Sequence, residues 1–251
     1  MLNETFIILI TLTAGFIGSM LGMGGGFLIV PLLVLILKLP MHKAVVISLA
    51  SVSGVTFSAF LTFFRNKLIN IKLGILLETF TVLRALLGSY LASHLDERFL
   101  EVIFGLTCIY VSFRIVRSVE HREYRIFKSK KFFFASLGSF LAGLIASMIG
   151  IGGGVLKVPI MTLILGTPIK LAIGTSEFMI MITSFVATLN YHLEGMGKFY
   201  YELFGVVGGF CGAQLGSKVS LKLDSVFLKR FFALVLFCFS VAMIIKGILV
   251  L

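Results

Sequence analysis

Two glycine clusters in this chain have a backbone chemistry that could attract an anion. The first cluster ends in Gly24, Gly25 and Gly26, and the second ends in Gly152, Gly153 and Gly154. A helix does not continue stably through such a run, because each glycine costs about 1 kcal/mol relative to alanine. The break exposes N–H groups at the start of the following helix, and these groups and the helix dipole favour a bound anion.

The two clusters are copies of one longer window. Gly15–Pro31 reads GFIGSMLGMGGGFLIVP, and Gly143–Pro159 reads GLIASMIGIGGGVLKVP in the same register. Eleven of the 17 positions are identical, with a displacement of 128 positions. Such an internal match indicates that the chain is two copies of one unit. Close helix packing alone is the competing explanation for the glycines, whereas no Lys-Ser or Lys-Thr pair follows them to make a nucleotide loop.

Two basic residues are candidates for contact with an anion. Arg84 lies in the middle of an apolar segment, where an arginine is costly and is typically functional, and its guanidinium suits bidentate binding of sulfonate or carboxylate oxygens. A structural pair with Glu177, or a side chain that reaches the membrane surface, is the alternative. Lys157 follows the second glycine cluster. It would add positive potential beside that cluster or reach a lipid headgroup.

Two further ionisable residues are candidates for carrying a coupling proton. Glu177 follows Gly-Thr-Ser near the start of its segment, and His192 ends the same segment. The alternatives are an acid held by the helix dipole for Glu177 and an interfacial histidine for His192. Glu78 and Glu202 align with a displacement of 124 positions, which favours a structural role for both. Pore-lining hydrogen bonds and helix-to-helix contacts are equal explanations for a set of hydroxyls: Ser19, Ser48, Ser51, Ser147 and Ser176.

The elements that must position these residues are membrane helices. The chain has 251 residues, of which 59% are hydrophobic and 13% charged, and its mean hydropathy is +1.10. Soluble domains carry about 25% charged residues, and apolar runs of about 20 residues suit helices rather than barrel strands. The sequence therefore predicts an all-α polytopic membrane protein. The net charge of +11 lies in short loops, which favours topogenic and lipid contacts over nucleic acid.

The segments repeat in order around a basic connector. We expect a first membrane repeat over residues 1–117, a cytoplasmic linker over 118–131 and a second membrane repeat over 132–251. Each repeat begins with a glycine-broken segment, and Gly205, Gly208, Gly212 and Gly216 are expected to pack helices closely. Cys108, Cys211 and Cys238 lie in apolar segments without CxxC spacing, so no metal or other cofactor is expected.

Loop charges predict how the repeats are oriented. The linker and the basic Lys218–Arg230 turn are expected on the cytoplasmic side of the membrane, whereas the equivalent Asp96–Glu101 turn is expected on the outer side. Equivalent turns on opposite sides require inverted repeats with an odd number of crossings. We therefore predict two inverted repeats of five helical segments, about ten in total, with both termini outside. Eight segments in parallel repeats are the alternative.

The duplicated pattern G-x-x-x-G-x-G-G-G-x-x-x-x-P resembles the sulfite exporter TauE/SafE family of membrane permeases. It runs from Gly18 to Pro31, and from Ala146 to Pro159 with one small-for-small departure. The resemblance covers the whole chain and implies export or uptake of small organosulfur anions, such as sulfite or sulfoacetate, across the cytoplasmic membrane.

The functional hypothesis is a multi-pass secondary transporter in the cell membrane, with alternating access around a midplane site between the glycine breaks. The expected partners are a small anion, the lipid bilayer and a coupling proton or sodium ion, and a homodimer is compatible with this interpretation. A passive channel for small anions is the alternative. An enzyme is not expected, because no HExxH motif, paired intramembrane aspartate or Ser-His dyad is visible.

Overall fold

The computed structural model of the chain describes residues 2–78, 87–88, 90–91, 94–116, 137, 140, 144, 148–150, 154–197, 199–223 and 225–249. These residues are helical or lie in turns and connections, and no strand occurs among them. The helices are α1 Leu2–Leu21, α2 Gly26–Leu35, α3 Met41–Arg65, α4 Ile71–Leu77, α6 Glu97–Val116, α8 Gly154–Leu163, α9 Ile169–Leu193, α10 Phe199–Ser220 and α11 Ser225–Leu249. The prediction of an all-α protein is confirmed for this part of the chain.

Local signals start several of these helices. Pro40 and Pro168 directly precede α3 and α9 with φ angles of −54° and −53°. Proline suits a helix start, because its φ angle is already near the helical value and its missing N–H would have no partner there. The Oδ1 atom of Asn70 accepts a hydrogen bond of 3.0 Å from the backbone N–H of Leu73 and caps α4.

The sequence repeat reappears in the helix bounds. Helices α2 and α8 begin and end 128 positions apart, and so do α3 and α9. Helices α4 and α10 begin at Ile71 and Phe199, and α6 and α11 begin at Glu97 and Ser225, again 128 positions apart. The position equivalent to Glu78 is therefore Val206 rather than Glu202. The predicted displacement of 124 positions for these two glutamates is not repeated in the helix starts.

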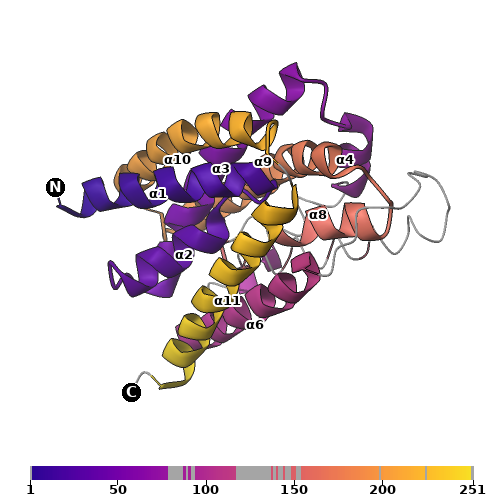
Figure 1. Cartoon of the computed structure of the whole chain (residues 1–251). Helices are drawn as coiled ribbons and strands as arrows, with labels where there is room; N and C mark the ends of the chain where they lie inside the picture. The colour runs from indigo at the N-terminus through magenta and orange to yellow at the C-terminus, as the bar shows by residue number, and fades with distance from the viewer. Residues whose placement is uncertain are drawn as a thin grey trace.

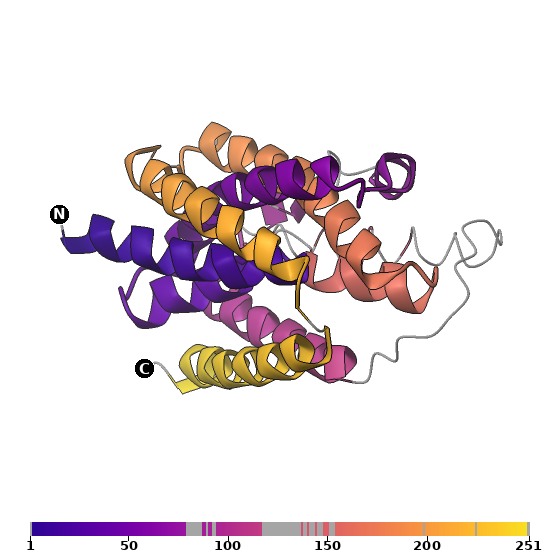
Figure 2. The same cartoon turned by 45° about the horizontal axis from the view of Figure 1, so that its top comes forward.

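Equivalent helices of the two halves cross in opposite directions. The rings of Phe60 and Phe178 lie 5.8 Å apart, and a Cβ atom on Gly174 would lie 3.0 Å from the Cβ of Phe63. Later residues of α3 therefore meet earlier residues of α9. Helices α6 and α11, which lie side by side in Figures 1 and 2, are also antiparallel. Contacts at both ends of this pair show it: Ser112 with Ala233, and Glu101 with Lys246.

Glycines let α10 approach α1 and α3 closely. A Cβ atom on Gly212 or Gly216 would lie 2.0 Å from the carbonyl oxygen of Leu12 or Phe16 on α1, so no larger residue fits there without displacing the backbone. Gly205 packs against Ser51 on α3 in the same way, and Gly208 packs against Thr11 on α1. The predicted packing role of this glycine row is confirmed.

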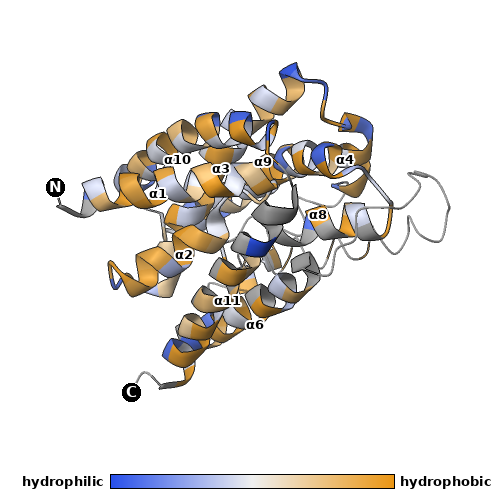
Figure 3. Ribbon diagram, viewed as in Figure 1, coloured by the Kyte–Doolittle hydropathy of each residue, from blue (hydrophilic) through white to orange (hydrophobic). Residues whose placement is uncertain are grey.

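The helices present apolar faces outward. Large apolar side chains on the outer faces are exposed, among them Phe57, Phe185, Leu234 and Ile248, and Figure 3 shows apolar residues recurring along the coloured parts of the helices. Three described stretches are long and apolar enough to cross a membrane: Glu4–Leu21, Met41–Arg65 and Ile169–Leu193. Outward apolar faces of this extent are the faces that lipid covers.

Helix α2 lies inside the protein. Phe27, Ile29 and Leu33 are fully buried, and a helix that is apolar all round belongs in a core. Its ten residues span about 15 Å, half of the roughly 30 Å bilayer core. The linker 118–131 and much of the region before α8 lie outside the described residues, so the ten-segment count and the division into repeats remain predictions.

Candidate functional site

The first glycine break reverses the chain between α1 and α2. Gly22, Gly24 and Gly25 have φ angles of 73°, 69° and 80°, which L side chains rarely adopt. A Cβ atom on Gly18 would lie 2.2 Å from the backbone nitrogen of Gly25, so the chain folds back directly onto α1. Helices α1 and α2 thus form a hairpin, and the break is its tip.

Each break is held by a serine from the other half of the chain. The hydroxyl of Ser48 donates a hydrogen bond of 2.7 Å to the carbonyl of Gly150. The hydroxyl of Ser176 donates one of 2.8 Å to the carbonyl of Gly22. The two serines are equivalent in the repeat, as are the two glycines, which have φ angles of 73° and 77°. A contact that exchanges equivalent groups in this way is the mark of a two-fold relation.

The carboxyl group of Glu177 faces the first break. This residue is fully buried on α9, and the backbone amide of Gly24 lies beside its carboxyl group. Among the described residues, neither carboxyl oxygen makes a hydrogen bond of good geometry. Glu177 is the ninth residue of α9, beyond the first turn in which the helix dipole acts, so the dipole does not explain this acid.

Lys157 belongs to a buried polar cluster next to the second break. Its ammonium group pairs with the carboxylate of Glu78 at the end of α4. It also donates a hydrogen bond of 2.9 Å to the hydroxyl of Thr183 on α9, and that hydroxyl lies 3.2 Å from the same carboxylate. Lys157 is 1% exposed and Glu78 6%. The lysine therefore lies inside the protein and not at a lipid headgroup.

This ionisable chemistry has no counterpart at the equivalent positions of the other half. Position 29, which is equivalent to Lys157, holds a buried isoleucine, and position 55, which is equivalent to Thr183, holds a buried valine. In the repeat, the position equivalent to Glu78 holds Val206, and the position equivalent to Glu177 holds Leu49. The frame of the breaks is two-fold, but the charges near them are not.

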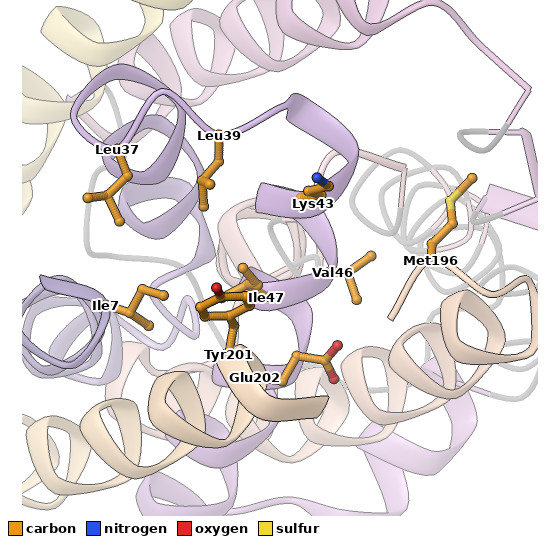
Figure 4. A pocket seen from close by; sticks show the side chains of 9 residues that line it. All are labelled: Ile7, Leu37, Leu39, Lys43, Val46, Ile47, Met196, Tyr201 and Glu202. Carbon is orange, nitrogen blue, oxygen red and sulfur yellow. The ribbon is translucent and has the colours of Figure 1, made fainter. Parts of the chain in front are cut away.

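A second polar pair, His192 and Glu202, lies where α9 ends and α10 begins. The Nε2 atom of His192 lies 2.6 Å from a carboxylate oxygen of Glu202, whose side chain is 4% exposed. Glu202 also lines a cavity of about 160 Å³ together with Lys43 and Tyr201. Figure 4 shows this cavity between the start of α3 and the start of α10. His192 is thus a partner of Glu202 rather than a residue beside either break.

The remaining predicted site residues have different positions. Ser19 is buried and joins α1 to the carbonyl of Ala213 on α10 at 3.3 Å. Ser51 bonds to its own helix at Ile47. Ser19 thus contributes to helix-to-helix contact, whereas Ser51 hydrogen-bonds within its own helix. Gly26 and Gly154 are the first residues of α2 and α8. Four predicted residues lie outside the described part: Arg84, Ser147, Gly152 and Gly153.

Sequence reasoning missed Glu78 and Thr183 as members of the cluster with Lys157. The available signal was the substitution of Ile29 by Lys157 at equivalent positions of two otherwise similar windows. A lysine placed where the copy has a buried aliphatic residue needs a carboxylate partner. With the displacement of 128 applied throughout, Glu78 and Thr183 are also polar residues that replace valines.

Comparison with known families agrees with the geometry of the duplicated breaks. The sequence profile described as sulfite exporter TauE/SafE matches residues 7–243. The chain belongs to this family. The match confirms the resemblance carried by the two glycine motifs. As a member of the TauE/SafE family, the chain is a membrane transporter.

Similar proteins of known sequence have related names and cover nearly the whole chain. A probable membrane transporter protein, YunE of Bacillus subtilis, is 26% identical over 97% of this chain and 99% of its own length. A probable membrane transporter protein of Haemophilus influenzae is 29% identical over 96% of this chain and 99% of its own length. No solved structure matches the chain. The described residues hold no cluster of His, Cys, Asp or Glu that could bind a metal ion.

Proposed function

We propose that this TauE/SafE member is a secondary transporter that moves small organosulfur anions, such as sulfite or sulfoacetate, across the cytoplasmic membrane. Its binding site lies between the two glycine breaks, and access to that site alternates between the two sides. The observation that carries the proposal is the reciprocal pair of hydrogen bonds from Ser48 to Gly150 and from Ser176 to Gly22. These bonds bring both broken segments to the interface of the two halves.

An inverted-repeat arrangement is part of this proposal. Its support is that equivalent helices run antiparallel, as α3 with α9 and α6 with α11 do. A two-fold axis perpendicular to membrane-crossing helices lies in the membrane plane, as it does in many secondary transporters. Rocking of one half against the other would then exchange equivalent conformations at the two sides of the membrane.

The local chemistry of the breaks suits an anion. Helices α2 and α8 both begin at a glycine break, so both direct the positive end of a helix dipole toward the interface of the halves. Lys157 adds a positive charge in the first turn of α8. Among the described residues, a carboxyl group of the protein lies at each of these positive groups. Glu177 lies beside the amide of Gly24, and Glu78 pairs with Lys157.

Glu177 is our candidate for the coupling group. An ionised carboxylate that is fully buried without a cationic partner is strongly unfavourable, so the group is expected to be neutral in this conformation. A conformation that opens the interface of the halves to water would let Glu177 ionise. One proton would then move with each cycle. Sodium would be the coupling ion instead if the carboxylate binds a cation when it is open to water.

Reconstitution into liposomes tests the proposed function. Uptake of ³⁵S-labelled sulfite should saturate, should be driven by a pH gradient and should be accelerated by unlabelled sulfite on the opposite side. Flux that does not saturate and shows no acceleration from the opposite side would favour a passive anion channel. Absence of flux for sulfite, thiosulfate and sulfoacetate alike would contradict the substrate class.

A further inference from the structure

The ion pair between Lys157 and Glu78 connects an element of the second half to an element of the first half. Lys157 lies in the first turn of α8, directly after the second break, and Glu78 ends α4. Both side chains are buried, with 0% and 3% exposure. Thr183 on α9 hydrogen-bonds to the lysine. Three elements thus meet at one charge pair inside the protein.

The fold itself does not require this pair. The first half builds the same helix, with the same bounds after the shift of 128, around a fully buried Ile29. It also places a fully buried Val55 where the second half has Thr183. A buried ion pair rarely adds stability over apolar residues of similar size. Because the positions related by the repeat pack well with apolar residues, the polar cluster of Lys157, Thr183 and Glu78 needs an explanation other than packing.

We propose that Glu78 is an exchangeable internal counter-ion, and that the transported anion displaces its carboxylate from Lys157 in each cycle. This inference rests on the proposed function and names the group that receives the substrate. A carboxylate and a small sulfur oxyanion offer the same chemistry to a lysine, namely oxygen atoms with negative charge. Without substrate, Glu78 satisfies the buried ammonium group, and with substrate the anion satisfies it and frees α4 to move.

The exchange keeps the affinity for the anion moderate, so that the anion can both bind and leave. An unpaired ammonium group inside the protein would hold an anion tightly, because removal of one partner of a buried pair is strongly unfavourable. Glu78 competes for the same ammonium group and therefore weakens anion binding. It also speeds release, because its carboxylate takes the place of the departing anion. Thr183 keeps the lysine oriented while the partners exchange, since its hydroxyl contacts both members of the pair.

Equilibrium binding of ³⁵S-labelled sulfite to purified protein tests this exchange. Glu78→Gln should bind sulfite at least tenfold more tightly than the unmodified protein and should transport it more slowly. Lys157→Gln in the Glu78→Gln background should abolish the gain. The triple variant Lys157→Ile, Thr183→Val and Glu78→Val copies the apolar residues at the positions related by the repeat, which are Ile29, Val55 and Val206, so it should remain folded and bind no sulfite.

Glu101→Gln is the matched control. It breaks another lysine–glutamate pair, with Lys246, between α6 and α11, and it should leave sulfite affinity unchanged. If the unmodified protein binds sulfite and Glu78→Gln binds it with the same affinity, the internal counter-ion is refuted and the proposed function stands. If neither protein binds sulfite, thiosulfate or sulfoacetate, both are refuted.

Discussion

Removal of Lys157 alone should destabilise the protein in a way that depends on pH. In Lys157→Ile the carboxyl group of Glu78 stays buried without its ammonium partner, so it must be protonated in the folded state. Because the ordinary pKa of glutamate is about 4.3, protonation at pH 7 costs about 3.7 kcal/mol, and at pH 5 about 1 kcal/mol. The free energy of unfolding should therefore fall by about 1.4 kcal/mol for each pH unit above the ordinary pKa.

The triple variant that copies the apolar repeat-equivalent residues should behave differently. Lys157→Ile, Thr183→Val and Glu78→Val together remove both charges and the hydroxyl, and they leave no buried carboxyl group to protonate. Replacement of a buried ion pair by apolar residues is often neutral or stabilising, by about 1–4 kcal/mol. The triple variant should therefore unfold no more easily than the unmodified protein at either pH.

Thermal unfolding in detergent at pH 5 and pH 7 measures both effects. For a chain of this size, about 3.7 kcal/mol corresponds to a decrease in Tm of roughly 7–15 °C. The reasoning is refuted if the triple variant loses as much stability as Lys157→Ile, because the polar cluster would then be needed for packing. It is also refuted if the single variant loses the same stability at both pH values.

Three other changes test different parts of the structure. Glu177→Gln should abolish the stimulation of sulfite uptake by a pH gradient but preserve exchange of sulfite for sulfite, and loss of both activities would argue against a role in coupling. Gly212→Ala should lower Tm, because overpacking against α1 costs about 3 kcal/mol or more. Gly195→Ala, with open space around it and a φ of 73°, should cost about 1–2 kcal/mol from backbone strain alone. Cysteines introduced at Arg122 and Lys222, in a background without the three native cysteines, should both react from the cytoplasmic side, and labelling from opposite sides would refute the ten-segment topology.

The repeat and the broken segments could be predicted from the sequence. A displacement of 128 positions relates the two windows, and the structure repeats it in the bounds of α2 and α8 and of α3 and α9. The close packing of the glycines on α10 also followed from the sequence. These features are local or periodic, and residue type and spacing are sufficient to specify them.

The partners of the charged residues could not be predicted in this way. Glu78 and Lys157 are 79 positions apart and Ser176 and Gly22 are 154 positions apart, and no sequence spacing indicates that such residues meet. The sequence suggested equivalence between Glu78 and Glu202, but each has a different partner: Lys157 for the first and His192 for the second.

The sequence by itself determined that this chain is a duplicated, α-helical membrane protein of the TauE/SafE family with glycine breaks in both halves. Hydropathy, glycine propensity and internal similarity carry that information along the chain. Only the tertiary structure decided that each break is held by a serine of the other half. It also decided that Lys157, Glu78 and Glu177 lie near the breaks, although the repeat-equivalent positions are apolar. The physical reason is that a buried hydroxyl or ammonium group finds its partner through the packing of distant helices.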